Sequence, residues 1–324
     1  MKPNNEVYAF LKNAYRKLPH RSYQWYTEKN VQFFGQQAND LIREKVKTVD
    51  KGLMVSKFGT VELTAVSSFL RNERGLTLTD YLDYIRGKGE IFPEKAMHTL
   101  YTNAGFFPMD IEYGKRFAHL VYQDMQQIDI LGSYVDQEDY FSQELSGCIK
   151  VNLEGYYAPF LWNNPWTMEL ANKKVLVVHP FAESILRQYE RRKKLFENPQ
   201  VLPEFRELTV IKAVQSIAGN GGNTEFCDWF EALAHMEREM DKRDYDVALI
   251  GCGAYGMNLA AHAKRRGKIA VHLAGWTQML FGIYGNRWIK DQPKYRKYIN
   301  ENWIRPSLSE RPTGVDIVEN ACYW

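Results

Sequence analysis

Short apolar runs alternate with amphipathic segments through the second half of the chain. Residues 175–179 (VLVVH) and 247–250 (VALI) are uninterrupted apolar runs, which are typical of parallel strands covered on both faces. The segments between such runs carry charges and place their apolar residues at helical spacing. This alternation predicts an α/β fold with a doubly wound, mostly parallel, Rossmann-like sheet and right-handed crossovers. The expected strands cover residues 52–59, 128–131, 175–179, 208–213, 246–250 and 268–273, and the expected helices cover residues 5–47, 60–69, 110–127, 184–196, 224–242 (with Thr224 as N-cap) and 255–266.

The same pattern divides the chain into two regions. We expect residues 1–50 to form an N-terminal helical extension, and residues 51–324 to form one continuous α/β domain, because no repeat or low-complexity linker interrupts them. A length of 324 residues, 45% of them hydrophobic, suits a core of that size. The longest uncharged stretch, residues 269–286, contains His272 and several glycines, so it predicts a strand and a turn and no transmembrane segment.

Charge and cysteine content narrow the class of protein. The 42 basic and 39 acidic residues leave a net charge of +3, which is too balanced for a nucleic-acid-binding protein. The four cysteines form no Cys-x-x-Cys pair and the N-terminus has no apolar signal sequence, so we expect a cytoplasmic protein. Nothing in the sequence decides between a monomer and a homo-oligomer.

Residues 251–256 (GCGAYG) connect an expected strand to an expected helix and match the pattern G-x-G-x-x-G. In such a turn Gly251, Gly253 and Gly256 let the backbone bend tightly and approach a phosphate, and N–H groups at the start of the helix bind the negative charge. A tight turn that needs glycine for packing alone is the alternative. No acidic residue occurs from 247 to 290, so the ribose-binding acid of dinucleotide sites is missing and the usual NAD-binding mode is excluded.

Residues 57–62 (KFGTVE) close the first expected strand and open a helix. Ligands of doubly wound sheets lie beyond the carboxyl ends of the strands, where this loop is expected. Glu62 falls in the first turn of the helix, where the helix dipole stabilises a carboxylate by roughly 0.3–1 kcal/mol. The same residue type can hold a divalent cation or activate an acceptor hydroxyl, and the sequence leaves these roles open.

The segment SKFGTVEL, residues 56–63, resembles the Arg-Phe-Gly-Asp-Gly-Glu segment of the bacterial GT-D-fold glycosyltransferases. Residues 249–256 (LIGCGAYG) look like the late strand, glycine turn and helix of the same family, and residues 282–288 are similar to the tail of polysaccharide-cluster proteins loosely associated with that fold. The resemblance implies a GT-D-like fold and a nucleotide-diphosphate sugar as donor. It also implies a glycan or lipid-linked acceptor in bacterial surface-polysaccharide synthesis.

One position departs from the family's pattern. The family's Asp-x-Glu is linked to metal binding, and Thr60 stands where the Asp would be, which leaves Glu62 as the one carboxylate. A carboxylate and a hydroxyl make a poor site for Mn²⁺ or Mg²⁺ unless the diphosphate supplies further oxygens. The resemblance therefore leaves metal dependence open. It suggests Lys57, where the family tends to have Arg, as a counter-charge for the leaving diphosphate.

Further polar residues follow the other expected strands. His179 and Glu183 are candidates for acid–base chemistry on the acceptor, and a buried structural histidine is the alternative. Gln215 and Ser216 are suited to contact a sugar or a base edge, and Arg287 is suited to hold a diphosphate unless it serves packing alone. The expected catalytic residues are Glu62, His179 and Glu183, and the expected donor-binding residues are Lys57, Gly59, Thr60, Gln215, Ser216, Gly251, Gly253, Tyr255, Gly256 and Arg287.

Two other functions fit the same pattern. One is a Rossmann-type oxidoreductase that holds NAD(P) in an atypical mode, since the glycine turn remains a candidate phosphate site. The other is a non-catalytic partner in glycan assembly, in which the glycine turn serves packing alone. Binding of a nucleotide sugar, of NADPH, or of neither separates the three functions.

Overall fold

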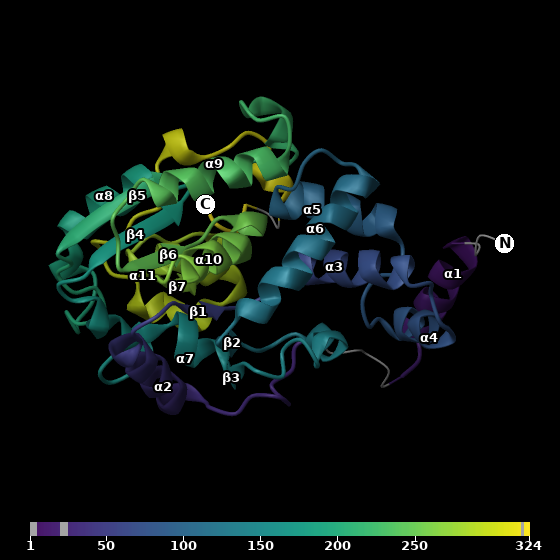
Figure 1. Ribbon diagram of the computed structural model, residues 1–324, viewed down its shortest axis with the longest axis horizontal. Helices are drawn as coiled ribbons and strands as arrows, with labels where there is room; N and C mark the ends of the chain where they lie inside the picture. Colours follow the sequence, from purple (N-terminus) through teal and green to yellow (C-terminus); the bar gives the residue numbers. More distant parts are fainter. Residues whose placement is uncertain (1–4, 20–24, 319–320) are drawn as a thin grey trace.

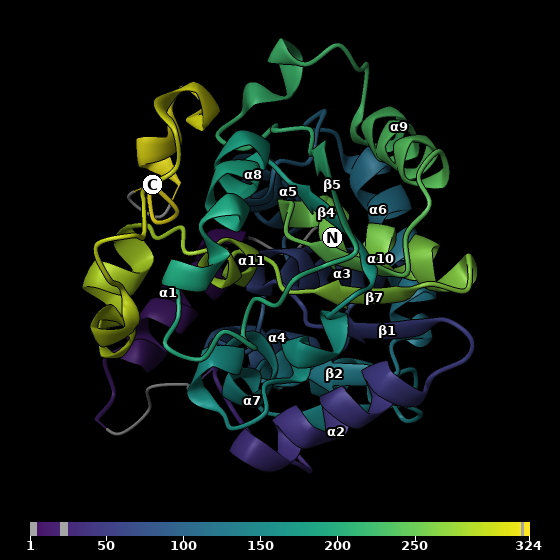
Figure 2. The same ribbon diagram turned by 90° about the vertical axis from the view of Figure 1, so that its left-hand side faces the viewer.

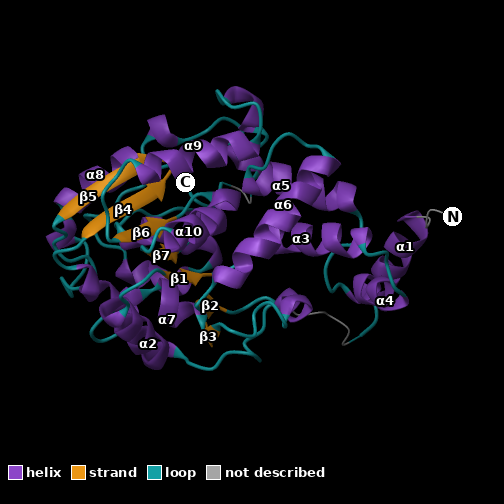
Figure 3. Ribbon diagram, viewed as in Figure 1, coloured by secondary structure: helices purple, strands orange, loops and turns teal. Residues whose placement is uncertain are grey.

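One seven-stranded sheet runs through the described part of the chain (Figures 1 and 3). The computed structural model describes residues 5–19, 25–318 and 321–324. Across the sheet the strand order is β3-β2-β1-β7-β6-β4-β5, and every pair of neighbours is parallel. The predicted α/β fold with a doubly wound, Rossmann-like sheet is confirmed. The strands are β1 Leu53–Ser56, β2 Ile130–Gly132, β3 Ile149–Val151, β4 Lys174–His179, β5 Glu207–Lys212, β6 Val247–Ile250 and β7 Ile269–His272.

The central strands consist of residues that suit a sheet covered on both faces. All residues of β1, β6 and β7 are buried, and β4 is buried from Val175 onward. Aliphatic side chains predominate in them, which is what burial on both faces requires. β5 lies at the edge of the sheet and carries the exposed residues Glu207 and Lys212 at its ends. Charged residues on an edge strand discourage pairing with another chain.

Helices cover both faces of the sheet. In Figure 2, α9, α10 and α6 lie on one side of the strands and α8 and α11 lie on the other. Right-handed crossovers produce this arrangement, because a change in the direction of the connections moves the helix to the opposite face. The helices are α1 Asn5–Arg16, α2 Gly35–Thr48, α3 Thr60–Glu73, α4 Leu78–Arg86, α5 Pro93–Ala104, α6 Ile111–Asp124, α7 Leu153–Tyr157, α8 Ala182–Glu190, α9 Trp229–Asp241, α10 Gly256–Arg265 and α11 Trp276–Leu280.

The connections change direction between β4 and β6. From β4 the chain passes through α8 to β5 at the edge, and it returns through α9 to β6 on the other side of β4. It then continues through α10 to β7, away from β4. In such sheets a crevice opens at the carboxyl ends of the two strands where the direction reverses, and ligands bind there. His179 at the end of β4 and Gly251 after β6 flank this point.

The residues before β1 divide between two parts of the molecule. α1 packs against α4, where the rings of Tyr8 and Tyr81 stack with centroids 4.6 Å apart. α2 packs against α7 and β1 and so belongs to the cover of the sheet. Residues 25–34 lie outside any helix, so the continuous helix expected over residues 5–47 is interrupted. α3, α5 and α6 lie between the sheet and the α1–α4 pair (Figure 1).

Two departures from the expected elements, an additional strand and a later helix start, have local reasons. β3 (IKV) was not expected, because three residues with a central lysine give no apolar run. α9 begins at Trp229 because the Asp228 carboxylate accepts a hydrogen bond from Glu231 N at 2.8 Å and caps the helix. The expected N-cap, Thr224, instead donates to Gly221 O in the preceding turn. Among the helices of the described residues, none has the length and apolar character needed to cross a membrane.

Candidate functional site

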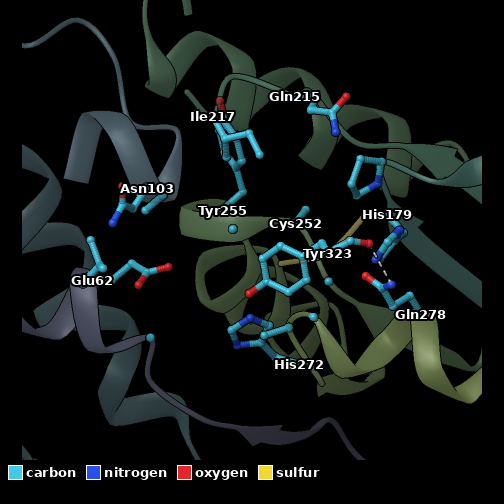
Figure 4. Close-up of a pocket in the computed structure, with 18 of the residues that line it drawn as sticks. Glu62, Asn103, His179, Gln215, Ile217, Cys252, Tyr255, His272, Gln278 and Tyr323 are labelled. Atoms are coloured by element: carbon cyan, nitrogen blue, oxygen red, sulfur yellow. Dashed lines mark hydrogen bonds between the residues drawn. The ribbon is translucent and has the colours of Figure 1, made fainter. Parts of the chain in front are cut away.

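A cavity lies at the carboxyl edge of the sheet, at the point where the connections change direction (Figure 4). Its walls come from the loops after β1, β4, β5, β6 and β7 and from the last residues of the chain. The cavity volume is about 190 Å³, whereas roughly 10–15 Å³ on the same measure holds one water molecule, so there is room for an organic ligand. Most of the expected site residues line it, namely Lys57, Gly59, Thr60, Glu62, His179, Gln215, Ser216, Gly251, Gly253, Tyr255 and Arg287.

Glu62 projects from the first turn of α3 into the cavity (Figure 4). Its carboxylate folds back over Gly59, the N-cap residue, so closely that any Cβ at position 59 would overlap Oε2. The carboxylate therefore sits at a helix N-terminus, as expected for dipole stabilisation, and it also faces the cavity. The two roles considered for Glu62 are compatible in this geometry.

Lys57 and Tyr134 form the wall beside Glu62. The Lys57 ammonium donates to Phe58 O at 2.9 Å and lies 5.2 Å from the centre of the Tyr134 ring. The Tyr134 hydroxyl donates to the same carbonyl at 2.8 Å. Burial raises the pKa of Tyr134 well above its usual value, and the negative charge of Glu62 adds to the shift. Lys57 is thus held at the cavity with a neutral phenol next to it.

Arg287 also lines the cavity, and residues near the C-terminus hold it in place. Its guanidinium donates to the Tyr323 hydroxyl at 2.9 Å and lies 4.5 Å from the centre of that ring, while its backbone N–H donates to Cys322 O. Gln278 Nε2 donates to Tyr323 O at 3.2 Å. The Tyr323 ring covers Gly275, where a Cβ would overlap it. Tyr323 and Trp324 therefore form part of the cavity wall, and no sequence pattern predicts this long-range contact.

His179 is a neutral hydrogen-bond donor. Its Nδ1 accepts a hydrogen bond from Phe181 N at 3.0 Å, so the ring proton sits on Nε2. Burial lowers the pKa of His179 to about 3, and the ring stays uncharged at neutral pH. With its lone pair engaged at Nδ1, the ring is suited to donate to an anionic or carbonyl oxygen and unsuited to accept a proton.

Glu183 does not join His179 at the cavity. It is exposed in the first turn of α8, and its carboxylate accepts a hydrogen bond from Ser309 Oγ at 3.3 Å. The acid–base pair expected from the sequence is therefore not formed. Glu183 is the one expected catalytic residue that lies outside the cavity.

The start of α8 is already occupied by a carboxylate of the protein. Glu310 is buried, and its side chain accepts hydrogen bonds from Glu183 N at 2.9 Å, Ser184 N at 3.1 Å, Ser184 Oγ at 2.5 Å and Ser307 N at 3.2 Å. An anionic ligand at this helix would take the same N–H groups. Two other helix starts face the cavity, namely the first turn of α3 and the 3₁₀ turn over Gly253–Tyr255 that leads into α10.

All three glycines of the 251–256 turn have a packing reason. A Cβ at Gly251 would overlap Ala274 O, and a Cβ at Gly256 would overlap His272 Nε2. Gly253 has φ +59° and would place a Cβ 2.9 Å from Ala104 O. The glycine pattern is thus explained by the fold without a phosphate. Gly253 and Tyr255 line the cavity, while Gly256 contacts His272 beneath it.

Gln215 supplies an unused donor. Its Nε2 is buried and has no hydrogen-bond partner within the described residues, and Figure 4 draws the amide at the upper rim of the cavity. A buried donor without a partner is costly, by about 1–3 kcal/mol, unless a ligand or water satisfies it. Neighbouring Ser216 is satisfied, since its hydroxyl donates to Gly105 O at 2.5 Å and lies 3.0 Å from the Tyr255 hydroxyl. Gln215 therefore points to a polar ligand, and Ser216 and Tyr255 brace the wall.

The charges around the cavity are unequal. Lys57 and Arg287 are its cations and Glu62 is its one acidic residue, counting the described residues alone. No group of three or more His, Cys, Asp or Glu side chains suited to a metal ion occurs among the residues with described positions. A divalent ion at Glu62 would accordingly need oxygens from a bound ligand.

Four further residues line the cavity that the sequence had not singled out, because they come from segments without a recognisable motif. They are Asn103, Tyr134, Tyr323 and Trp324. In comparisons with protein families, curated proteins and solved structures, nothing matched the chain.

Proposed function

We propose that this protein is a glycosyltransferase that uses a nucleotide-diphosphate sugar as donor in bacterial surface-polysaccharide synthesis. The observation that carries the proposal is the convergence of two segments that lie far apart in the chain. Residues 57–62 and 251–256, which both resemble segments of the GT-D-fold glycosyltransferases, line one cavity at the switch point of the sheet. Ligand sites of doubly wound sheets lie at such points.

The chemistry of the walls suits a diphosphate. Lys57 and Arg287 supply two positive charges, and the helix start at Gly253–Tyr255 supplies backbone N–H groups that have no acceptor within their own helix. The His179 Nε2–H and the Gln215 Nε2 add neutral donors for the sugar or the base. Donors that are fixed before the reaction stabilise the charge that develops on the leaving diphosphate.

Glu62 is the group proposed to act on the acceptor. As a carboxylate facing the cavity, it is placed to accept the proton of an acceptor hydroxyl while that oxygen attacks the anomeric carbon of the donor. The bond from that carbon to the diphosphate oxygen breaks, and the diphosphate leaves with its electron pair. If Mn²⁺ or Mg²⁺ takes part, Glu62 and the diphosphate oxygens would hold it, and Lys57 would share the neutralisation.

Donor titration tests the proposal. Thermal unfolding and calorimetry of the full chain with UDP-, GDP-, CDP- and TDP-sugars, with and without Mn²⁺, should reveal stabilisation by one class of donor. A ligand at a hundredfold excess over its Kd stabilises a protein by about 2.7 kcal/mol. Lys57→Met and Arg287→Met should weaken binding, because each removes a charge that faces the diphosphate.

The matched pair of carboxylate variants separates chemistry from folding. Glu62→Gln should abolish transfer with donor binding largely retained, whereas Glu183→Gln, at an exposed carboxylate outside the cavity, should leave both unchanged. Stabilisation by NADPH instead of a nucleotide sugar would favour the oxidoreductase, and no nucleotide binding at all would favour a non-catalytic role. Either result would overturn the proposal.

A further inference from the structure

A second, shallower groove begins where the cavity ends. It is lined by residues from the segment before α2, the start of α3, the turn between α4 and α5, and the segment after β2. Thr60 lines both the cavity and this groove. We name it the Trp25 groove; its main lining residues are Trp25, Thr60, Thr64, Glu90, Val135 and Gln137.

We propose that the Trp25 groove binds the acceptor of the reaction and that this acceptor is an uncharged glycan. The proposal rests on the function proposed above, and it assigns the second substrate to a place and a chemical class. Its basis is the continuity of the groove with the cavity, the exposed indole of Trp25, and a set of fixed polar groups opposite that indole.

Backbone hydrogen bonds hold the segment around Trp25 in place, while the Trp25 side chain is exposed. Asp136 N donates to Trp25 O at 3.0 Å, and Thr27 N donates to Tyr134 O at 2.9 Å, so this segment runs alongside the residues that follow β2. Tyr26 forms an antiparallel bridge with Val135. The Trp25 side chain is nevertheless 53% exposed. A hydrogen-bonded backbone with an exposed indole suits a stacking platform, because a rigid aromatic ring covers an apolar ring face at low entropy cost.

Tyr134 connects this platform to the cavity. Its ring meets that of Trp25 edge to face, with centroids 6.4 Å apart, and Tyr134 also lines the cavity. Thr60 and Thr64 lie one helical turn apart on α3 and face the groove, while Glu62 from the same turn faces the cavity. A glycan seated against Trp25 would thus present its terminal hydroxyls at Thr60, beside the carboxylate proposed to act on them.

The polar groups of the groove match vicinal hydroxyls. Thr64 Oγ1 donates to Gln137 Oε1 at 3.0 Å, which orients the amide and leaves its Nε2 to serve as a donor. The Glu90 carboxylate is held by Ile91 N at 3.1 Å and by Lys95 at 3.0 Å. Oriented amides and carboxylates bind hydroxyl groups without having to reorganise.

Charge and apolar area exclude other occupants. Lys95, at the margin of the groove, is paired with Glu90, and no Lys or Arg occurs among the described residues that line the groove, which disfavours a polyanionic chain. Trp25 and Val135 are the only large apolar groups among its lining residues in the described chain, which is too little apolar area for a lipid tail or an amphipathic helix. An uncharged chain with apolar ring faces and many hydroxyls fits both conditions.

The test is binding of the full chain to an array of neutral and anionic oligosaccharides, with a peptide array beside it. Trp25→Ala should reduce the signal on neutral oligosaccharides by about tenfold, because loss of one stacking contact of about 1.4 kcal/mol has that effect. Trp25→Phe should recover part of it. Phe34→Ala serves as the matched control, since Phe34 is also exposed (46%) and does not line the groove.

The outcomes distinguish this proposal from the one before it. If nucleotide sugars bind and Trp25→Ala loses oligosaccharide binding while Phe34→Ala keeps it, the acceptor assignment stands. Three results would overturn the groove assignment and leave the donor site in place, provided that nucleotide sugars bind. The wild type binds no oligosaccharide, or it binds peptides instead, or the Trp25→Ala variant binds oligosaccharides as tightly as the wild type does. If no nucleotide sugar binds, the acceptor role falls together with the proposed function, even where Trp25-dependent glycan binding persists.

Discussion

Two buried histidines should make this fold sensitive to mild acid. Burial lowers the pKa of His179 to about 3, and it does the same for His272, where the positive charge of Lys57 contributes as well. Their side chains are almost fully removed from solvent, at 2% and 4% relative exposure. In the unfolded chain a histidine has a pKa of about 6.5. As the pH falls from neutral, these histidines therefore become protonated in the unfolded state but stay neutral in the folded state.

The sign and size of the effect follow by linkage. The contribution of each histidine to stability is fully present above about pH 6.5 and is lost progressively between pH 6.5 and pH 3, because the folded-state pKa is the lower one. Within that pH range, each histidine lowers the free energy of unfolding by about 1.4 kcal/mol for every pH unit of acidification. At pH 5 this amounts to about 2 kcal/mol for each histidine and about 4 kcal/mol for the pair.

Urea unfolding at pH 7 and pH 5 measures this loss. His179→Asn should reduce the difference between the two pH values by about 2 kcal/mol relative to wild type, because asparagine does not titrate. His98→Asn, at an exposed histidine, serves as the control. If wild type and His179→Asn lose the same stability between pH 7 and pH 5, the neutral, buried state assigned to His179 is wrong.

Three further substitutions test the packing and capping derived above, and urea unfolding measures each of them. Gly256→Ala should lower the free energy of unfolding by about 1–3 kcal/mol, because the added Cβ overlaps His272. Gly222→Ala, whose Cβ meets open space, should change it by less than about 0.5 kcal/mol, and equal effects of the two variants would refute the overlap. Glu310→Gln should cost about 1.5–3 kcal/mol, since a charged acceptor is lost at the start of α8, and an unchanged midpoint would contradict its capping role. Asp228→Ala should lower the free energy of unfolding by about 1 kcal/mol, because the N-cap of α9 is lost. An unchanged free energy of unfolding would show that Asp228 does not cap the helix.

The central strands were accessible from sequence because burial on both faces leaves a strong pattern. Residues 175–178 and 247–250 are apolar throughout, and the strands expected over 175–179 and 246–250 lie within one residue of the bounds of β4 and β6. β3 left no such pattern because it is three residues long, has a lysine at its centre and has one neighbouring strand in the sheet. Its place at the edge depends on pairing with β2, which is a tertiary contact that periodicity does not report.

The sequence predicted those site residues that follow the ends of strands. It did not predict the residues whose place in the site depends on the direction of a side chain or on the docking of a distant segment. Parallel strands bring their carboxyl ends to one edge, so Lys57, Gln215 and Gly253 were expected together and do line one cavity. Glu183 was paired with His179 on proximity in sequence, but the first turn of α8 directs it away. Tyr323 enters the cavity by docking of a distant segment, for which no local pattern exists.

The proposed function requires that the cavity at the switch point hold a nucleotide-diphosphate sugar. A crystal structure of the full chain with the nucleoside diphosphate of the stabilising donor, in the presence of Mn²⁺, tests it most directly. We expect the diphosphate to lie between Lys57 and Arg287 at the Gly253–Tyr255 helix start, with Glu62 facing the same space. A diphosphate bound elsewhere on the molecule, with the cavity unchanged, would contradict it.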